Sequence, residues 1–184
     1  MEKGGSTVTL GTLEPQSGRL TMAQLGDSTY SIVRQRQTTF HMSEEQVHGF
    51  NFPFQLSAYS PSQKAWAEQT LDRPEKAIVQ DFDLQPDDLV VVGTDGVFDN
   101  IYPQDVLDTV RDHLSEARLG QLVKALSKSE QPVTQDTMHQ VELISLAHTA
   151  QSLVDLAVRH SLRQNYLSPF AKRAQAASMR YNSG

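Results

Sequence analysis

The 184-residue sequence contains no cysteine. Disulfide bridges, thiolate zinc sites and cysteine nucleophiles are therefore excluded, and the composition is compatible with a reducing compartment. Basic residues are scarce as well: 16 Lys and Arg stand against 22 Asp and Glu, which gives a net charge of −6 and a pI near 5.4. Nucleic acids and anionic membranes reward a basic face, so neither is expected as the main partner.

Long hydrophobic runs and targeting signals are also missing. No apolar stretch approaches the roughly 18 residues that span a bilayer, so the sequence predicts a soluble chain without a membrane span. The first residues, MEKGGSTVTL, have neither the apolar core of a signal peptide nor the Arg-rich pattern of a transit peptide. The histidines form no HExxH metal motif, and no internal repeat is present.

The front half of the chain is rich in strand-forming residues. STVTLGTLEP, RLTMAQLGDSTYSIVRQRQ and AIVQDFDLQPDDLVVVGTDG predict strands, broken by turns at Ser17-Gly18, at Gly26-Asp27 and in QPDD. The aromatic and proline-containing segment 40–73 has no periodicity, and we expect a loop there.

The back half predicts helices. They are expected from Pro103 onward, across LGQLVKALSK, and from Met138 to Arg163, with Asp136 or Thr137 as the cap of the last one. Strands first and helices after favour an antiparallel α+β fold over alternating βαβ units. The length suits a single domain, strand-rich over 5–100 and helical over 101–175.

The stretch LVVVGTDGVFDN, Leu89 to Asn100, carries the first candidate site. Its apolar run lacks polar alternation, which predicts a strand covered on both faces, with Asp95 at its end. A carboxylate there is costly to desolvate unless a cation or hydrogen-bond donors compensate it, and Gly96 lets a ligand approach closely. Mg²⁺ and Mn²⁺ prefer such oxygens, but an ordinary Asp-Gly turn explains the same residues.

Asp27, in AQLGDSTYSI, raises the same two alternatives, because Gly26-Asp27 also suits a tight turn between two strands. We interpret Asp99 as structural, since an acid near a helix start interacts favourably with the helix dipole. The histidines are scattered over loop and helix and do not form a convincing set of ligands or a catalytic triad.

Several motifs together resemble the metal-dependent PP2C-type serine/threonine phosphatases. Gly5-Ser6-Thr7, LGDS (25–28) and LVVVGTDGVFDN follow one another in the family's order. HGFNFPFQLS (48–57) and YLSPFAKRA (166–174) resemble its organellar, PPTC7-like branch, which includes mitochondrial enzymes. The resemblance covers nearly the whole chain.

The resemblance implies an antiparallel β-sandwich flanked by helices, in α-β-β-α layers, and a binuclear Mn²⁺ or Mg²⁺ centre. It implies that metal-activated water hydrolyses phosphoserine and phosphothreonine in proteins without a phosphoenzyme. Asp95 matches a core metal ligand of the family. Asp27 matches the aspartate that, together with the counterpart of Asp95, holds a third and weaker metal. No catalytic residue besides these metal positions is carried over.

The family pattern also includes motifs that these 184 residues do not contain. Its first Asp-Gly motif and a phosphate-binding arginine are expected upstream of Gly5, and its last metal aspartate, in Gly-x-x-Asp-Asp-Ile/Val-Thr, downstream of Gly184. A two-metal centre needs several fixed anionic ligands. We therefore expect an incomplete fold: a central segment of a phosphatase, inactive alone. The alternative is a non-catalytic phosphatase-like module that binds partners through segment 40–73.

Overall fold

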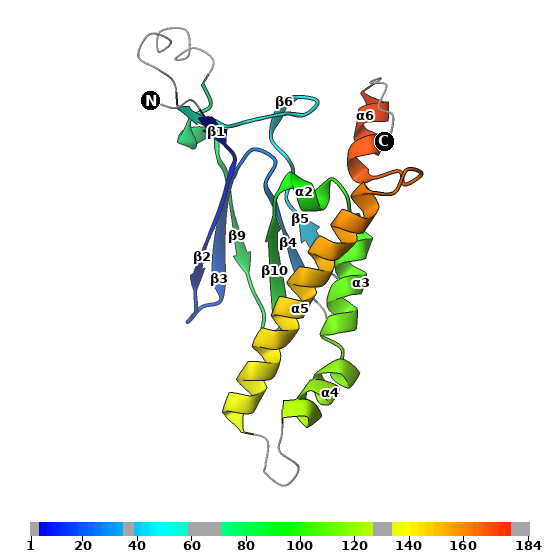
Figure 1. The fold of residues 1–184 in the computed structure, drawn as a ribbon. Coiled ribbons are helices and arrows are strands. Elements are labelled where there is room, and N and C mark those ends of the chain that lie inside the picture. Colours follow the sequence, from blue (N-terminus) through cyan, green and yellow to red (C-terminus); the bar gives the residue numbers. More distant parts are fainter. Residues whose placement is uncertain (1–3, 35–38, 59–70, 127–133, 178–184) are drawn as a thin grey trace. The chain divides into compact units, whose positions relative to one another are not determined.

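The computed structural model describes residues 4–34, 39–58, 71–126 and 134–177 (Figure 1). The chain forms two compact units, the first made of Met1–Gly96 with Arg173–Met179 and the second of Val97–Lys172 with Arg180–Gly184. The first unit carries the strands and the second most of the helical residues, as the sequence predicts. That both units form one domain stays a prediction.

In the described residues of the first unit, the strands form two antiparallel three-stranded sheets, in the orders β2-β3-β9 and β10-β4-β5, and two short antiparallel pairs, β1-β8 and β6-β7 (Figure 1). The strands are β1 (Gly4–Ser6), β2 (Val8–Glu14), β3 (Arg19–Leu25), β4 (Thr29–Arg34), β5 (Thr39–Met42), β6 (Val47–Gly49), β7 (Phe52–Pro53), β8 (Leu56–Ala58), β9 (Ile78–Asp83) and β10 (Asp88–Gly93), and the 3₁₀-helix η3 lies at Pro74–Lys76.

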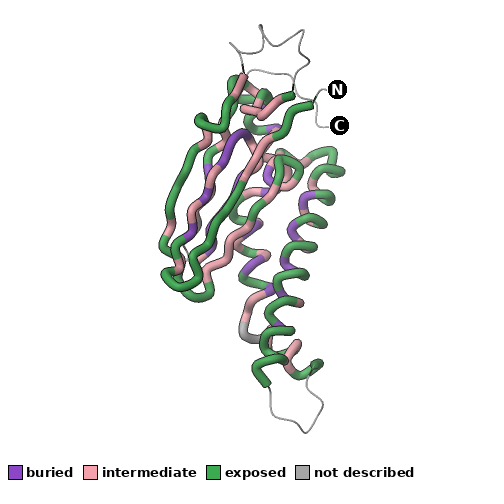
Figure 2. Tube along the Cα trace, turned by 90° about the vertical axis from the view of Figure 1, so that its left-hand side faces the viewer, coloured by how far each residue is buried: buried purple, intermediate pink, exposed green. Residues whose placement is uncertain are grey.

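The two larger sheets share one core. Side chains alternate between the faces of a strand, and accordingly every second residue of β3 from Leu20 to Gln24 is buried. The strand β4 is buried along almost its whole length, and Figure 2 shows buried segments within the strands. Burial of each such side chain contributes about 1.5–3 kcal/mol. The buried cluster and the half-buried side chains against it are Leu20, Met22, Tyr30, Ile32, Phe82, Leu84 and Val90.

The strands on either side of Gly26-Asp27 do not pair with each other. β3 lies in one sheet and β4 in the other, so this turn carries the chain across the sandwich and is not a hairpin. Gly26 has φ +101°, and a Cβ there would lie 2.5 Å from the carbonyl oxygen of Phe54. Only glycine meets both requirements without strain.

Two other predictions about the strands are corrected. Segment 40–73 is not simply a loop, because β5 pairs with β4 and β8 pairs with β1; partners distant in sequence override the local composition. Its residues 59–70 lie outside the described part of the chain. The strand β10 is not covered on both faces, because the Val92 side chain is 55% exposed.

The predicted helices are all present: α3 (Pro103–His113), α4 (Glu116–Leu126) and α5 (Gln135–Ser161), preceded by the short α2 (Asp95–Phe98) and followed by α6 (Pro169–Ala176). Both α3 and α4 pack against α5. The cap of α5 is Thr134, whose side chain accepts a hydrogen bond from the Thr137 N–H at 3.2 Å, so the predicted caps Asp136 and Thr137 are wrong.

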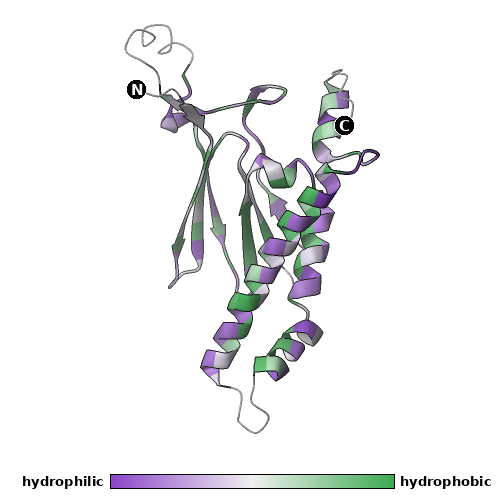
Figure 3. Cartoon of the chain, viewed as in Figure 1, coloured by the Kyte–Doolittle hydropathy of each residue, from purple (hydrophilic) through white to green (hydrophobic). Residues whose placement is uncertain are grey.

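Along α5, apolar and polar residues alternate in bands (Figure 3). By length and composition this helix is long and apolar enough to cross a membrane, although a core helix of a water-soluble protein meets the same criterion. The expectation of a chain without a membrane span therefore stays a prediction.

Candidate metal centre

Asp27 and Asp95 lie at the same end of the sheet β10-β4-β5. In the antiparallel register of β4 and β10, Thr29 is opposite Gly93. Asp27 stands two residues before Thr29, and Asp95 stands two residues after Gly93, so both leave the same end of this strand pair. Burial raises the pKa of Asp27, and the negative charge of Asp95 raises it further.

The two carboxyl groups have different surroundings. Asp27 is half-buried, and burial, more than the charge of Asp95, raises its pKa above the ordinary value. Asp95 is exposed at the start of α2, where its Oδ1 accepts a hydrogen bond from the Gly96 N–H at 2.7 Å. Asp95 is therefore accessible to a ligand from solvent, whereas Asp27 is less exposed.

A third carboxylate, Glu45, belongs to the same end. It follows β5, and the Gln46 N–H donates to the Gly26 carbonyl at 3.0 Å, directly beside Asp27. Burial raises the pKa of Glu45, and Asp27 and Asp95 raise it further, whereas Arg173 lowers it. Nothing in the local pattern SEEQ indicates this role. The pairing of β5 with β4 and the hydrogen bond from Gln46 to Gly26 bring Glu45 here.

The donor atoms fit a hard divalent cation in kind, because carboxylate oxygens are what Mg²⁺ and Mn²⁺ prefer. They are not sufficient in number. Over residues 4–34, 39–58, 71–126 and 134–177, no group of three or more His, Cys, Asp or Glu side chains is arranged so that it holds a metal ion. That Asp27 and Asp95 are metal ligands stays a prediction.

Asp99 does not have the predicted role at a helix start. It lies between α2 and α3, and the acid at the beginning of α3 is Asp105, whose Oδ2 accepts a hydrogen bond from the Tyr102 N–H at 2.7 Å. An acid four residues before Pro103 is too far from the first turn, where the helix dipole acts.

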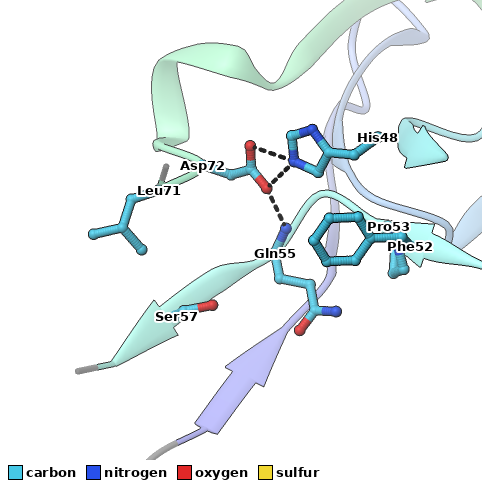
Figure 4. Close-up of a pocket in the computed structure, with 7 residues that line it drawn as sticks. All are labelled: His48, Phe52, Pro53, Gln55, Ser57, Leu71 and Asp72. Atoms are coloured by element: carbon cyan, nitrogen blue, oxygen red, sulfur yellow. Dashed lines mark hydrogen bonds and ion pairs between the residues drawn. The ribbon is translucent and has the colours of Figure 1, made fainter. Parts of the chain in front are cut away.

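His48 lies in a small polar pocket of about 140 Å³. Its Nε2 lies 2.9 Å from the carboxylate of Asp72, which also accepts from the backbone N–H of Gln55 at 2.9 Å; Figure 4 shows both groups converging on Asp72. Lys76 Nζ also lies 2.9 Å from the Asp72 carboxylate. The pocket is lined by His48, Phe52, Pro53, Gln55, Ser57, Leu71 and Asp72.

This pocket segment adjoins the turn that carries Asp27. The Phe54 N–H donates to the Gln46 carbonyl at 3.0 Å, while the carbonyl oxygen of Phe54 approaches Gly26. The ring of His48 stacks on Phe54 with centroids 4.1 Å apart. Asp72 thus fixes a segment that rests directly on the turn carrying Asp27, a connection that the sequence alone does not reveal.

The fold defines a class of protein. A solved structure, the photosystem II phosphatase PBCP, matches with a TM-score of 0.65 and 26% identity, over 96% of this chain and 53% of that one. The chain therefore has an α+β fold of the PP2C phosphatase type, as its sequence predicts. No protein-family model matches the chain.

Within that class, the chain resembles the PTC7 phosphatases. It is 38% identical to "Protein phosphatase PTC7 homolog fig" of Drosophila grimshawi over 181 residues, 98% of this chain and 50% of that protein. It is 34% identical to the PTC7 homolog of Danio rerio over 171 residues, 93% and 48% of the two chains. The predicted resemblance is confirmed, and the chain spans about half the length of these relatives.

Proposed function

We propose that the protein is a metal-dependent protein-serine/threonine phosphatase and that the residues described here carry part of its metal centre. The convergence of Asp27 and Asp95 at one end of β4 and β10 carries this proposal. Two carboxylates at neighbouring strand ends repel each other, which is a liability in a purely structural turn and useful where a cation binds.

In this function Asp95 is a ligand of the core metals, and Asp27, together with Asp95, holds a weaker one. The exposure of Asp95 suits a position that a hydrated ion reaches from solvent, and the half-buried Asp27 suits a fixed neighbour. The metal, Mn²⁺ or Mg²⁺, supplies activation of water and neutralisation of phosphate charge.

Phosphoserine and phosphothreonine proteins are the proposed substrates. The net charge of −6 opposes nucleic acid as a partner, in keeping with this class of substrate. By its resemblance to the PPTC7-like branch we propose an organellar, mitochondrial setting. The relatives named as PTC7 homologs support the assignment to this branch. The mitochondrial setting is inferred from the branch.

The test is phosphate release from a phosphothreonine peptide with Mn²⁺ and with EDTA, a phosphotyrosine peptide serving as the control substrate. We expect EDTA-sensitive release from phosphothreonine by the full-length gene product, and little release by the 184-residue chain. Absence of metal-dependent release by the full-length product contradicts the proposal and favours the partner-binding module. Turnover by the 184-residue chain that is comparable with that of the full-length product contradicts the expected inactivity of the segment.

A further inference from the structure

The helix α4 is weakly held among the three helices α3, α4 and α5, which pack together in the second unit (Figure 1). Buried side chains hold α3 and α5, among them Val110 and Val141. Among the α4 residues whose side chains are described, none is buried, and the apolar Leu119, Leu122 and Val123 are half-buried. Local stability follows the apolar contacts of an element, so we expect α4 to open before its neighbours.

A buried histidine lies at the junction of α3 and α4. His113 is the last residue of α3, and Leu114 and Ser115 separate it from the start of α4. His113 is 8% exposed, and its Nδ1 is buried without a hydrogen-bond partner among the described residues. A neutral imidazole tolerates this position better than an imidazolium, which has two N–H donors and a charge that need partners or water.

The charged groups around His113 come from all three helices. Burial is the main cause that lowers the pKa of His113 below its ordinary value of 6.5. Arg118 on α4 and His148 on α5 lower the pKa further, whereas Asp112 on α3 acts in the opposite direction. A proton on His113 therefore faces a positive side chain of α4, and a movement of α4 relieves both this repulsion and the lack of hydration.

We propose that His113 is the trigger of an acid-sensitive latch: neutral His113 lets α4 close on α3 and α5, and protonated His113 releases α4. The hinge is the turn Leu114-Ser115, where the Ser115 hydroxyl donates to the Asp112 carbonyl at 3.0 Å and keeps the turn fixed to α3. Release exposes the half-buried apolar side chains of α4 and the side of α5 that they cover. The latch depends neither on the metal assignment nor on the proposed phosphatase activity.

The pH dependence of the latch has a defined sign and an upper limit. A histidine whose pKa is lowered in the closed state binds a proton more readily once α4 opens. Opening is therefore favoured as the pH falls below the ordinary value of 6.5. Because one proton is taken up, the opening equilibrium increases by at most about tenfold between about pH 7.5 and 5.5.

Native-state hydrogen exchange of the 184-residue chain measures the opening of each helix. Protection of the α4 amides is compared with that of the α5 amides at about pH 7.5 and 5.5, in low concentrations of urea and after correction for the intrinsic pH dependence of exchange. We expect protection of α4 to fall by up to about tenfold at the lower pH. This fall depends weakly on urea, because a local opening exposes little surface, whereas exchange of α5 through global unfolding depends steeply on urea.

Two variants show whether His113 is the trigger. His113→Asn is expected to give the same α4 protection at both pH values, and a general loss of stability cancels because the comparison is made within one variant. His139→Asn removes an exposed histidine from α5 and is the matched control that keeps the wild-type response. If His113→Asn does not fold, Arg118→Gln takes its place. Its response is smaller than that of wild type, because a positive charge near His113 is removed.

Unchanged protection of α4 between the two pH values in wild type overturns the inference, as does an undiminished response in His113→Asn or, in its place, in Arg118→Gln. Loss of the response in His139→Asn also overturns it, because the trigger is then another histidine. A fall in protection that shows only the steep urea dependence of α5 means that His113 acts on global unfolding, and the latch is then overturned as well.

Discussion

Replacement of Asp72 by alanine tests how the segment beside Asp27 is held. The Asp72 side chain is only 6% exposed and accepts three hydrogen bonds, from His48, from Lys76 and from the backbone N–H of Gln55. The substitution leaves the half-buried Gln55 N–H without its partner and releases the His48 and Lys76 side chains from the carboxylate.

The expected cost follows from these contacts. A hydrogen bond to a charged group contributes about 1.5–3 kcal/mol. His48 and Lys76 are 32% and 45% exposed, so water replaces much of what they lose. We therefore expect a net loss of about 2–4 kcal/mol for Asp72→Ala. In a chain of this length, that lowers Tm by about 5–12 °C.

The effect depends on pH in a defined direction. Burial raises the pKa of Asp72, but the hydrogen bonds from His48 and Lys76 outweigh it, so the pKa lies below its ordinary value of 3.8. A carboxyl group with a lowered folded-state pKa stabilises the protein above its unfolded pKa, and this contribution is lost as the pH falls through the folded-state pKa. The Tm difference between wild type and Asp72→Ala is therefore full at pH 7 and shrinks below about pH 4.

Thermal unfolding by circular dichroism and calorimetry measures this difference. Asp81→Asn is the matched control: Asp81 also pairs with a cation, Arg19 at 2.6 Å, but the two side chains are 47% and 57% exposed. Solvent screens such a pair, so Tm stays nearly unchanged. Equal Tm values for Asp72→Ala and wild type at pH 7, or equal losses in both variants, refute the reasoning.

Three further substitutions test other parts of the fold. Gly26→Ala places a Cβ 2.5 Å from the Phe54 carbonyl at a φ of +101°, and we expect a drop in Tm, measured by calorimetry; an unchanged Tm contradicts the close approach. Arg34→Met leaves Asp88, 2% exposed, without its cation at 2.7 Å, and urea titration is expected to show a loss of about 3 kcal/mol. Burial lowers the pKa of His113, so the free energy of unfolding falls as the pH drops below about 6.5, the ordinary value. We expect His113→Asn to make the free energy of unfolding less dependent on pH between about pH 7.5 and 5.5. A pH dependence equal to that of wild type disproves this role of His113.

Most of the local structure is predictable from the sequence because the patterns are local. Strand-forming residues identify β3 and β4, and helical spacing identifies α3 and α5. The Asp95 and Asp27 positions are found only through the resemblance, since an Asp-Gly or Gly-Asp pair by itself fits a turn as well.

The remaining features depend on contacts between distant parts of the chain. Segment 40–73 has a loop-like composition, yet β5 and β8 form there because β4 and β1 offer them partners. Glu45 reaches Asp27 through that pairing, and Asp72 reaches His48 across 24 residues. No local propensity encodes such contacts, so neither Glu45 nor the Asp72 cluster is predicted from the sequence.

The most direct test of the central claim is turnover of a phosphothreonine peptide by the full-length protein with Asp95→Asn, measured together with Tm. We predict that turnover with Mn²⁺ falls by orders of magnitude, about tenfold for each 1.4 kcal/mol of transition-state stabilisation lost. Tm in metal-free buffer stays similar or rises, because an uncompensated acid is removed. Asp27→Asn reduces turnover less, and Asp83→Asn, an exposed acid on β9, leaves it unchanged. Full activity of Asp95→Asn contradicts the account.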